Sequence, residues 1–257
     1  MKNIDLVGCK NVRDLGGILA DGGKVKEHRF LRGVSMDNAS KGDIEKLVNE
    51  YKLSTIIDLR SFREKDERPD PEIPNVKYLH MPIFNNRFPG ITHESQEDFE
   101  RDFKDYKLDM SKMYSGMLRE EYLDKVSEII KTIINLKENE YSVLFHCTEG
   151  KDRTGLIAAL ILLILGADKK SIIEDYLYTN IVNKKKAEKI YWKVRILGRN
   201  KTKAENMRKA FLAKEEYINA AFDVIENDWD GVEDFIENGL KISKEDVEKF
   251  KKNNILF

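Results

Sequence analysis

Apolar and polar positions along the chain follow the pattern of strands that alternate with helices. An apolar, β-branched run at residues 141–145 predicts a buried strand. After a polar loop, ten apolar residues from Leu156 to Leu165 predict a buried helix that ends at Gly166. The same reading predicts strands at residues 29–34, 54–59 and 76–83, and helices at residues 44–51 and 126–134.

Turn and cap signals sharpen this outline. Asp21-Gly22-Gly23 predicts a small hairpin over residues 18–25. Ser40 and Ser243 each stand three residues before an aspartate, which is typical of a helix start. Strands that alternate with helices predict an α/β fold, with a mostly parallel central sheet flanked by helices on both faces. We expect one domain over residues 1–257.

Composition and charge limit the class of protein. A net charge of −1 gives no case for nucleic-acid binding, and two cysteines cannot build a disulfide framework of the secreted kind. The first residues lack an apolar signal region, and an apolar run of ten residues is too short for a bilayer, which needs about 20. We therefore expect a soluble, reduced, cytoplasmic protein, although export without a leader stays open.

The loop between the strand at 141–145 and the next helix carries the chemistry. A strand–loop–helix turn points backbone N–H groups and the positive end of the helix dipole into one concavity. This field favours the thiolate of Cys147, and the planar fork of Arg153 can grip two phosphoryl oxygens. Thr154 can donate a hydrogen bond to the thiolate as it leaves, and His146 can shape the loop from behind. The other loop residues that we expect around a bound phosphate are Thr148, Glu149, Gly150 and Lys151.

The loop His146–Gly155 resembles the Cys-x5-Arg phosphate loop of the protein-tyrosine-phosphatase superfamily. Its Gly-Lys-Asp-Arg-Thr-Gly form is similar to that of the atypical bacterial branch, which acts on phosphotyrosine and often on phosphoinositides. Further matches to the family lie at residues 11–17, 32–35, 56–61 with Glu64, and 217–222.

The resemblance implies a cysteine phosphatase fold and two-step hydrolysis through a cysteinyl-phosphate, with inorganic phosphate as the product. It implies no cofactor and no metal, and no His, Asp or Glu cluster in the sequence has ligand spacing. Arg13 and Arg60 lie within matched segments, so we expect them among the phosphate-binding residues.

The general acid has two main candidates. Asp152 precedes Arg153 directly, so its carboxylate must lie near the bound phosphate. Asp58 ends a neighbouring strand and therefore reaches the same edge of the sheet. We assign Asp152 as acid and later base, and Asp58 as the residue that orients Arg153, while the reverse assignment stays open. The acidic segment 85–109 offers further carboxylates at Asp98, Asp102, Asp105 and Asp109.

Residues 181–215 form a basic segment of twelve positive and three negative charges, a net +9. Its apolar content predicts two helices broken near Gly198. The family resemblance implies a helical lid over the site, which could meet an anionic substrate or make weak contact with an anionic membrane surface. A solvated helical hairpin without a specific role is the equally weighted alternative.

The substrate class and two rival functions remain to be decided. Glu149 places a negative charge where a highly anionic head group would bind, so we place phosphotyrosine protein first, phosphoserine or phosphothreonine as possible additions, and phosphoinositides second. One rival is a phosphate-binding module without turnover. The other is a redox enzyme in which Cys9 pairs with Cys147, but we favour Cys9 as a small buried apolar residue.

Overall fold

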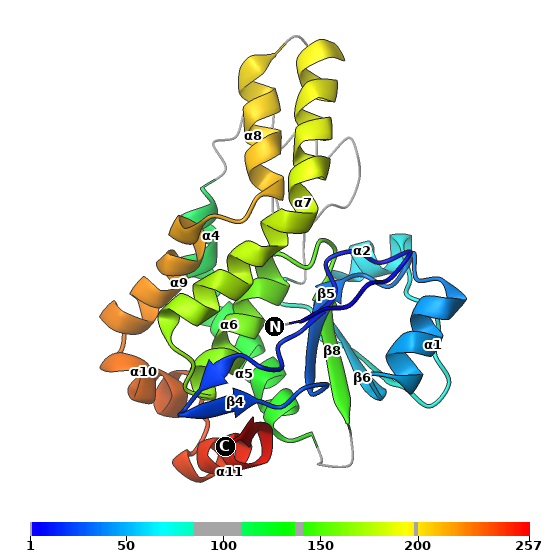
Figure 1. Ribbon diagram of the computed structural model, residues 1–257. Coiled ribbons are helices and arrows are strands. Elements are labelled where there is room, and N and C mark those ends of the chain that lie inside the picture. The colour runs from blue at the N-terminus through cyan, green and yellow to red at the C-terminus, as the bar shows by residue number, and fades with distance from the viewer. Residues whose placement is uncertain (1, 85–108, 137–140, 198–199) are drawn as a thin grey trace.

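A six-stranded sheet forms the centre of the molecule in the computed structural model, which describes residues 2–84, 109–136, 141–197 and 200–257 (Figure 1). The strand order is β1-β2-β5-β8-β6-β7. Neighbours from β5 to β7 run parallel, whereas β1 and β2 are antiparallel, so the mostly parallel α/β sheet is confirmed. The strands of this sheet are β1 (Lys2–Asn3), β2 (Arg13–Asp14), β5 (Phe30–Val34), β6 (Leu53–Asp58), β7 (Lys77–His80) and β8 (Ser142–Cys147).

A second, three-stranded sheet joins the two ends of the chain. It has the order β3-β4-β9, with β3 (Leu19–Ala20), β4 (Gly23–Val25) and β9 (Ile255–Leu256). The hairpin expected at residues 18–25 is confirmed as β3 and β4. Asp21 and Gly22 adopt positive φ angles of 47° and 79° in its turn, as a type I′ turn requires.

Helices cover both faces of the central sheet. The helices are α1 (Lys41–Asn49), α2 (Phe62–Glu67), α4 (Met110–Gly116), α5 (Glu120–Ile134), α6 (Asp152–Ile164), α7 (Lys169–Leu197), α8 (Lys201–Phe211), α9 (Glu215–Asn227), α10 (Gly231–Asp234), a π-helical turn (Phe235–Gly239) and α11 (Lys244–Asn254).

Side chains alternate between two hydrophobic cores along the central strands. In β8, Leu144 packs with Leu47 of α1 on one face. Val143 and Phe145 point to the other face, where they pack with α5, α6 and α9. This alternation explains why the strands read as continuous apolar runs, because both faces of a parallel sheet are buried.

The predicted helix signals hold, with shifted boundaries. Ser40 caps α1 in a reciprocal capping box, Ser243 caps α11, and Gly166 ends the helical run with φ 81°. The buried helix begins at Asp152, four residues before its apolar run, because the phosphate loop leads directly into the first helical turn.

Two further elements differ in length from their predictions. The strand expected over 76–83 is limited to Lys77–His80. The first helix expected within 181–215 begins at Lys169 and runs for 29 residues to Leu197. The far end of α7 and the whole of α8 form a hairpin that projects from the body (Figure 1). Across the described ranges, no helix is both long and apolar enough to cross a membrane.

Candidate active site

The phosphate loop, Thr148–Lys151, lies between β8 and α6 at the carboxyl edge of the parallel strands. Cys147 is the last residue of β8, and Arg153 is the second residue of α6. The Cys147 and Arg153 side chains are buried, with relative exposures of 2% and 1%. The topology therefore brings the predicted nucleophile and the predicted oxyanion ligand to one helix N-terminus.

The outer side of the phosphate loop is fixed through its carbonyl groups. Asn11 Nδ2 donates to the carbonyls of Glu149 and Gly150, at 3.2 and 3.3 Å. Arg32 Nη2 donates to the same Gly150 carbonyl at 3.0 Å. Since the C=O and N–H of a trans peptide point in opposite directions, the N–H groups of Gly150 and Lys151 are turned away from Asn11 and Arg32, toward the inside of the loop.

Glycine is required at position 150. Its φ of 64° lies in the left-handed region. A Cβ at this position would come within 2.6 Å of the Gly33 carbonyl carbon and oxygen. The phosphate loop therefore packs directly against the backbone of β5.

Glu64 holds Arg153 in place. Its carboxylate accepts from Arg153 Nη1 at 2.6 Å and Nη2 at 2.9 Å, and from the Thr148 hydroxyl at 2.5 Å. Burial alone would raise the pKa of Glu64, but the charge of Arg153 and the hydrogen bonds from Arg153 and Thr148 hold it well below its usual range. Glu64 is thus an ionised clamp for Arg153, at the position where the sequence analysis expected Asp58.

Thr154 has a hydroxyl group that remains available within the site. The side chain is fully buried, and no hydrogen-bond partner for its Oγ1 occurs in the described part of the chain. A buried hydroxyl in the first turn of α6 suits the predicted role of a donor to the thiolate, because an unsatisfied buried donor is otherwise costly.

Asp152 lies in the first turn of α6 and is almost completely buried. Its Oδ1 accepts from the Tyr114 hydroxyl at 2.9 Å and lies 3.4 Å from Lys151 Nζ. Tyr114 also bonds the Tyr176 hydroxyl at 2.8 Å. Burial and the nearby Asp152 charge raise the pKa of Tyr114 well above its usual value, so Tyr114 stays protonated and donates to Asp152.

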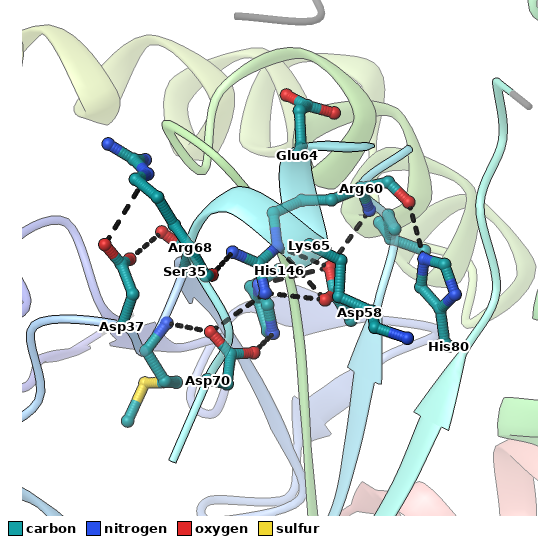
Figure 2. A network of polar contacts seen from close by, with 12 residues as sticks. Ser35, Asp37, Asp58, Arg60, Glu64, Lys65, Arg68, Asp70, His80 and His146 are labelled. Carbon is teal, nitrogen blue, oxygen red and sulfur yellow. Dashed lines mark hydrogen bonds and ion pairs between the residues drawn. The ribbon is translucent and has the colours of Figure 1, made fainter. Parts of the chain in front are cut away.

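Asp58 and Arg60 pair with each other behind the loop. Asp58 Oδ2 accepts from Arg60 Nη2 at 2.7 Å and from the Tyr78 hydroxyl at 2.5 Å. Burial would raise the pKa of Asp58, but the charge of His146 and the bonds from Arg60 lower it far below its usual value. Asp58 therefore faces Arg60 and not Arg153, and both Asp58 and Arg60 are fully buried within the network of Figure 2.

Arg13 takes a supporting position instead of the predicted phosphate contact. Its Nε donates to Asp175 at 2.8 Å and its Nη1 to Asn11 Oδ1 at 2.7 Å. Arg32 shares the same Asp175 carboxylate. Burial and the neighbouring Arg32 charge lower the pKa of Arg13 to about 10. Arg13 thus braces Asn11, which in turn braces the phosphate loop.

Two residues of the phosphate loop contact the α7–α8 hairpin. Glu149 forms an ion pair with Lys186 of α7, whose Nζ lies 2.7 and 2.8 Å from the two carboxylate oxygens. Lys151 is buried and donates to the Ala210 carbonyl of α8. Both side chains expected around the phosphate therefore also join the loop to the predicted lid.

A comparison with protein families decides the identity of this site. Residues 4–255 match the model of the tyrosine phosphatase family. The chain belongs to the tyrosine phosphatase family. The match spans nearly the whole chain, including the phosphate loop and the buried carboxylate–arginine pairs around it.

The individual relatives share about a quarter of their residues with this chain. The phosphatase is 25% identical to the candidate tyrosine-protein phosphatase H16_A0669 of Cupriavidus necator over 243 residues, which is 90% of this chain and 82% of the relative. It is 26% identical to the triple specificity protein phosphatase PtpB of Mycobacterium tuberculosis over 200 residues, or 68% of each chain. Among solved structures, P. aeruginosa TpbA matches 81% of this chain and 97% of its own at 14% identity, with a TM-score of 0.36.

A cluster that could hold a cation lies behind the phosphate loop. Asp58, Asp70 and His146 offer ligand atoms within 4.8 Å of one another, although they are far apart in the sequence. The sequence analysis expected no metal because no His, Asp or Glu cluster in the sequence has ligand spacing, and that argument missed this cluster. Arg60 contacts both carboxylates, so a guanidinium already supplies positive charge there.

The roles of several supporting residues of the phosphatase were not predicted from the sequence. Glu64 was matched to the family, but it stands three residues after Ser61 in a capping box, so its local signal is that of a helix start and not of a partner for Arg153. Asp70 stands between two prolines, and Asp175 lies inside the long helix α7. Of the acidic residues considered as distal acids, Asp98, Asp102 and Asp105 lie outside the described residues, and Asp109 is an exposed N-cap of α4.

Cys9 has the surroundings of a structural residue. Its thiol is buried and lies 3.6 Å from the Ser35 carbonyl, which it can donate to. Burial raises the pKa of the Cys9 thiol to about 12, which disfavours the thiolate that disulfide exchange needs. Cys9 and Cys147 are both free cysteines.

Glu64→Gln should lower kcat/KM of the phosphatase roughly 10–100-fold, because an amide turns a donor toward the guanidinium and releases Arg153 from its position. Steady-state kinetics with an aryl phosphate measure the effect. Glu67→Gln is the matched control, since Glu67 lies on the same helix but pairs with Arg63 in an exposed bridge. Equal activity of the Glu64 variant and the control would contradict the clamp.

Proposed function

We propose that this phosphatase hydrolyses phosphotyrosine in proteins through a cysteinyl-phosphate intermediate, with phosphoserine and phosphothreonine as further substrates. The Cys147 thiolate attacks phosphorus, and the bond to the tyrosyl oxygen breaks. Water then attacks the phosphorus of the intermediate, which releases inorganic phosphate and regenerates the thiolate. No cofactor enters either step.

The orientation of the phosphate loop is the observation that carries this proposal. Asn11 and Arg32 bind the loop carbonyls from outside, so the N–H groups of Gly150 and Lys151 face the inside. Arg153 lies in the first turn of α6, directly after this loop, and is held by Glu64. Donors fixed in advance toward the equatorial phosphoryl oxygens stabilise the transition state without reorganisation.

Cys147→Ser should abolish turnover and leave the binding of a phosphate analogue within a few-fold of wild type, because the cradle consists of backbone groups and Arg153 and not of the thiol. Turnover is measured on a panel of phosphotyrosine, phosphoserine and phosphothreonine peptides, and binding by vanadate or tungstate titration. Turnover above a few percent of wild type would refute the nucleophile. Tight binding without turnover in the unmodified protein would favour a phosphate-binding module.

The acid in this mechanism is Asp152, with Asp58 as a supporting residue. Asp152 adjoins Arg153 and takes a hydrogen bond from Tyr114, which orients its carboxylate. Asp58 is engaged by Arg60 and Tyr78 and is strongly held in its ionised form, which does not suit proton donation.

Asp152→Asn should cost little with a nitrophenyl-type ester and roughly 10²–10⁴-fold more with an unactivated aryl or alkyl phosphate, because only a poor leaving group needs the proton. Asp58→Asn should lower both rates by similar factors. A series of phosphate esters with leaving groups of graded pKa makes the measurement. A flat response for Asp152→Asn and a graded one for Asp58→Asn would exchange the two roles.

Phosphoinositides are the second candidate substrate, and the Glu149–Lys186 pair favours them. The negative charge of Glu149 was the reason to rank them second. Lys186 neutralises that charge at 2.7 Å, at a position where the pair remains partly exposed to solvent. Because the Glu149–Lys186 pair has no net charge, it removes the electrostatic penalty that Glu149 alone would impose on a head group with several phosphates.

Lys186→Ala should lower kcat/KM for a phosphoinositide up to roughly five-fold more than for a phosphotyrosine peptide, because it leaves Glu149 unpaired at the rim. Adding Glu149→Gln should restore the ratio. Lys189→Ala removes the same charge from an exposed position one turn further along α7 and serves as the control. Equal effects of the two lysine variants would show that Lys186 acts through its positive charge alone and not through its pairing with Glu149.

Weak contact of the α7–α8 hairpin with an anionic membrane surface is also part of the proposal. The segment 181–215 carries +9, and α7 exposes Ile181, Trp192, Ile196 and Leu197 among its basic residues. Trp192, Ile196 and Leu197 lie in the last turns of α7, and this end of the helix belongs to the projecting hairpin (Figure 1).

Co-sedimentation with vesicles of mixed neutral and anionic lipid should detect the protein at low salt and lose it at high salt, because polybasic contacts are screened. Trp192→Ala should weaken the binding several-fold. Lack of binding to anionic vesicles at low salt would leave the hairpin as a solvated surface or a cover for the site.

A further inference from the structure

Two buried tyrosines lie directly behind Asp152. The Tyr114 hydroxyl lies 2.9 Å from Asp152 Oδ1 and 2.8 Å from the Tyr176 hydroxyl. Both tyrosines are at most 1% exposed, and their rings meet nearly at right angles, with centroids 5.8 Å apart and an interplanar angle of 76°. Tyr114 belongs to α4, Tyr176 to α7 and Asp152 to α6, so three helices meet at this chain of hydrogen bonds.

The three polar groups fix the direction of the two hydrogen bonds. An ionised carboxylate only accepts, so the bond to Asp152 uses the one hydroxyl proton of Tyr114. Tyr114 must then accept from the Tyr176 hydroxyl through an oxygen lone pair. Burial and the nearby charge of Asp152 raise the pKa of both tyrosines well above the usual value, so both hydroxyl groups keep their protons.

Glycine at position 155 makes room for this arrangement. A Cβ at Gly155 would lie 3.0 Å from Tyr176 Cδ2 and 3.1 Å from Tyr176 Cε2. Gly155 lies in the same first turn of α6 as Asp152. The last residue of the phosphate-loop motif therefore allows the Tyr176 ring to pack against the turn that carries the acid.

The two carboxylate oxygens of Asp152 differ as a result. Oδ1 accepts from Tyr114 and lies 3.4 Å from Lys151 Nζ. A proton on Oδ1 would face the hydroxyl proton of Tyr114 and the ammonium group of Lys151, and it would force both tyrosine hydroxyls to reverse. A proton on Oδ2 leaves both hydrogen bonds intact, because Oδ1 of a neutral carboxyl group still accepts.

We propose that Tyr114 and Tyr176 are positioning residues that confine the transferable proton of Asp152 to Oδ2. The inference deepens the proposed function and rests on it. In the first step, Oδ2 gives its proton to the tyrosyl oxygen as the bond from that oxygen to phosphorus breaks, and the electron pair of this bond stays on the oxygen. In the second step, Oδ2 takes a proton from the attacking water, so the carboxyl group returns to its starting form.

Tyr114→Phe removes the hydroxyl and keeps the buried ring. Without this donor the Asp152 carboxyl group can hold its proton on either oxygen, so a smaller share of the enzyme is ready to protonate a leaving group. With each enzyme at its own pH optimum, kcat/KM should fall roughly ten-fold more with an unactivated aryl phosphate than with a nitrophenyl ester. Tyr176→Phe should show the same graded loss at roughly two- to four-fold, because it removes only the support of Tyr114.

Tyr217→Phe is the matched control. The Tyr217 ring stacks on Tyr114 with centroids 6.2 Å apart and is 5% exposed, but among the described residues no hydrogen bond joins its hydroxyl to Asp152. This variant should leave the dependence on the leaving group unchanged. A flat loss in Tyr114→Phe, or an equally graded loss in Tyr217→Phe, would overturn the proposal. If Tyr114→Phe does not fold, a flat response of Tyr176→Phe overturns it.

A double variant separates the tyrosines from the acid itself. Asp152→Asn combined with Tyr114→Phe should lose no more activity on the unactivated ester than Asp152→Asn alone, because Tyr114 acts only through Asp152. A further ten-fold loss in the double variant would contradict this. A flat response of Asp152→Asn alone would remove the acid of the proposed function together with this inference. A graded response of Asp152→Asn beside a flat one of Tyr114→Phe would leave the proposed function intact and overturn only the assignment of the proton to Oδ2.

Discussion

The phosphate loop can offer its N–H groups to an anion only if its carbonyl groups are satisfied on the opposite side. Asn11, two residues before β2, and Arg32, on β5, meet this condition, and Gly150 allows the backbone to come close enough for it. Much of the surrounding structure follows from the same requirement. Asp175 on α7 holds Arg32, and also Arg13, which positions Asn11.

Buried arginines surround the loop, and each has an acidic partner. Arg13 and Arg32 share Asp175, Arg60 lies between Asp58 and Asp70, and Arg153 is paired with Glu64. A buried ion pair of good geometry contributes little net stability, but removal of one partner is costly because the other charge is left in a medium of low dielectric constant. The pairs therefore specify the positions of the guanidinium groups more than they stabilise the fold.

Local signals in the sequence predicted most of the elements and the centre of the site. The apolar runs gave β8 and α6, and the Cys147–Arg153 spacing between them gave the phosphate loop. Assignment of the supporting carboxylates failed because it depends on which side chains meet across the sheet edge. Asp58 ends β6 and Glu64 lies six positions further on, and the sequence carries no sign that the capping residue Glu64, and not Asp58, reaches Arg153. Arg13 and Arg60 belong to matched motifs, yet both are buried in ion pairs, Arg13 with Asp175, which lies 162 positions further along the chain, and Arg60 with Asp58 and Asp70.

The contacts that shape the loop join residues separated by as much as 162 positions in sequence. Such long-range pairs cannot form in a fragment, because each needs the ordered backbone of several distant segments. Asn11, Arg32, Glu64 and Asp175 must all be in place before the loop has its final form. An anion that occupies the loop therefore binds only a nearly complete fold, and by mass action it shifts the unfolding equilibrium of the whole domain and not that of a single segment.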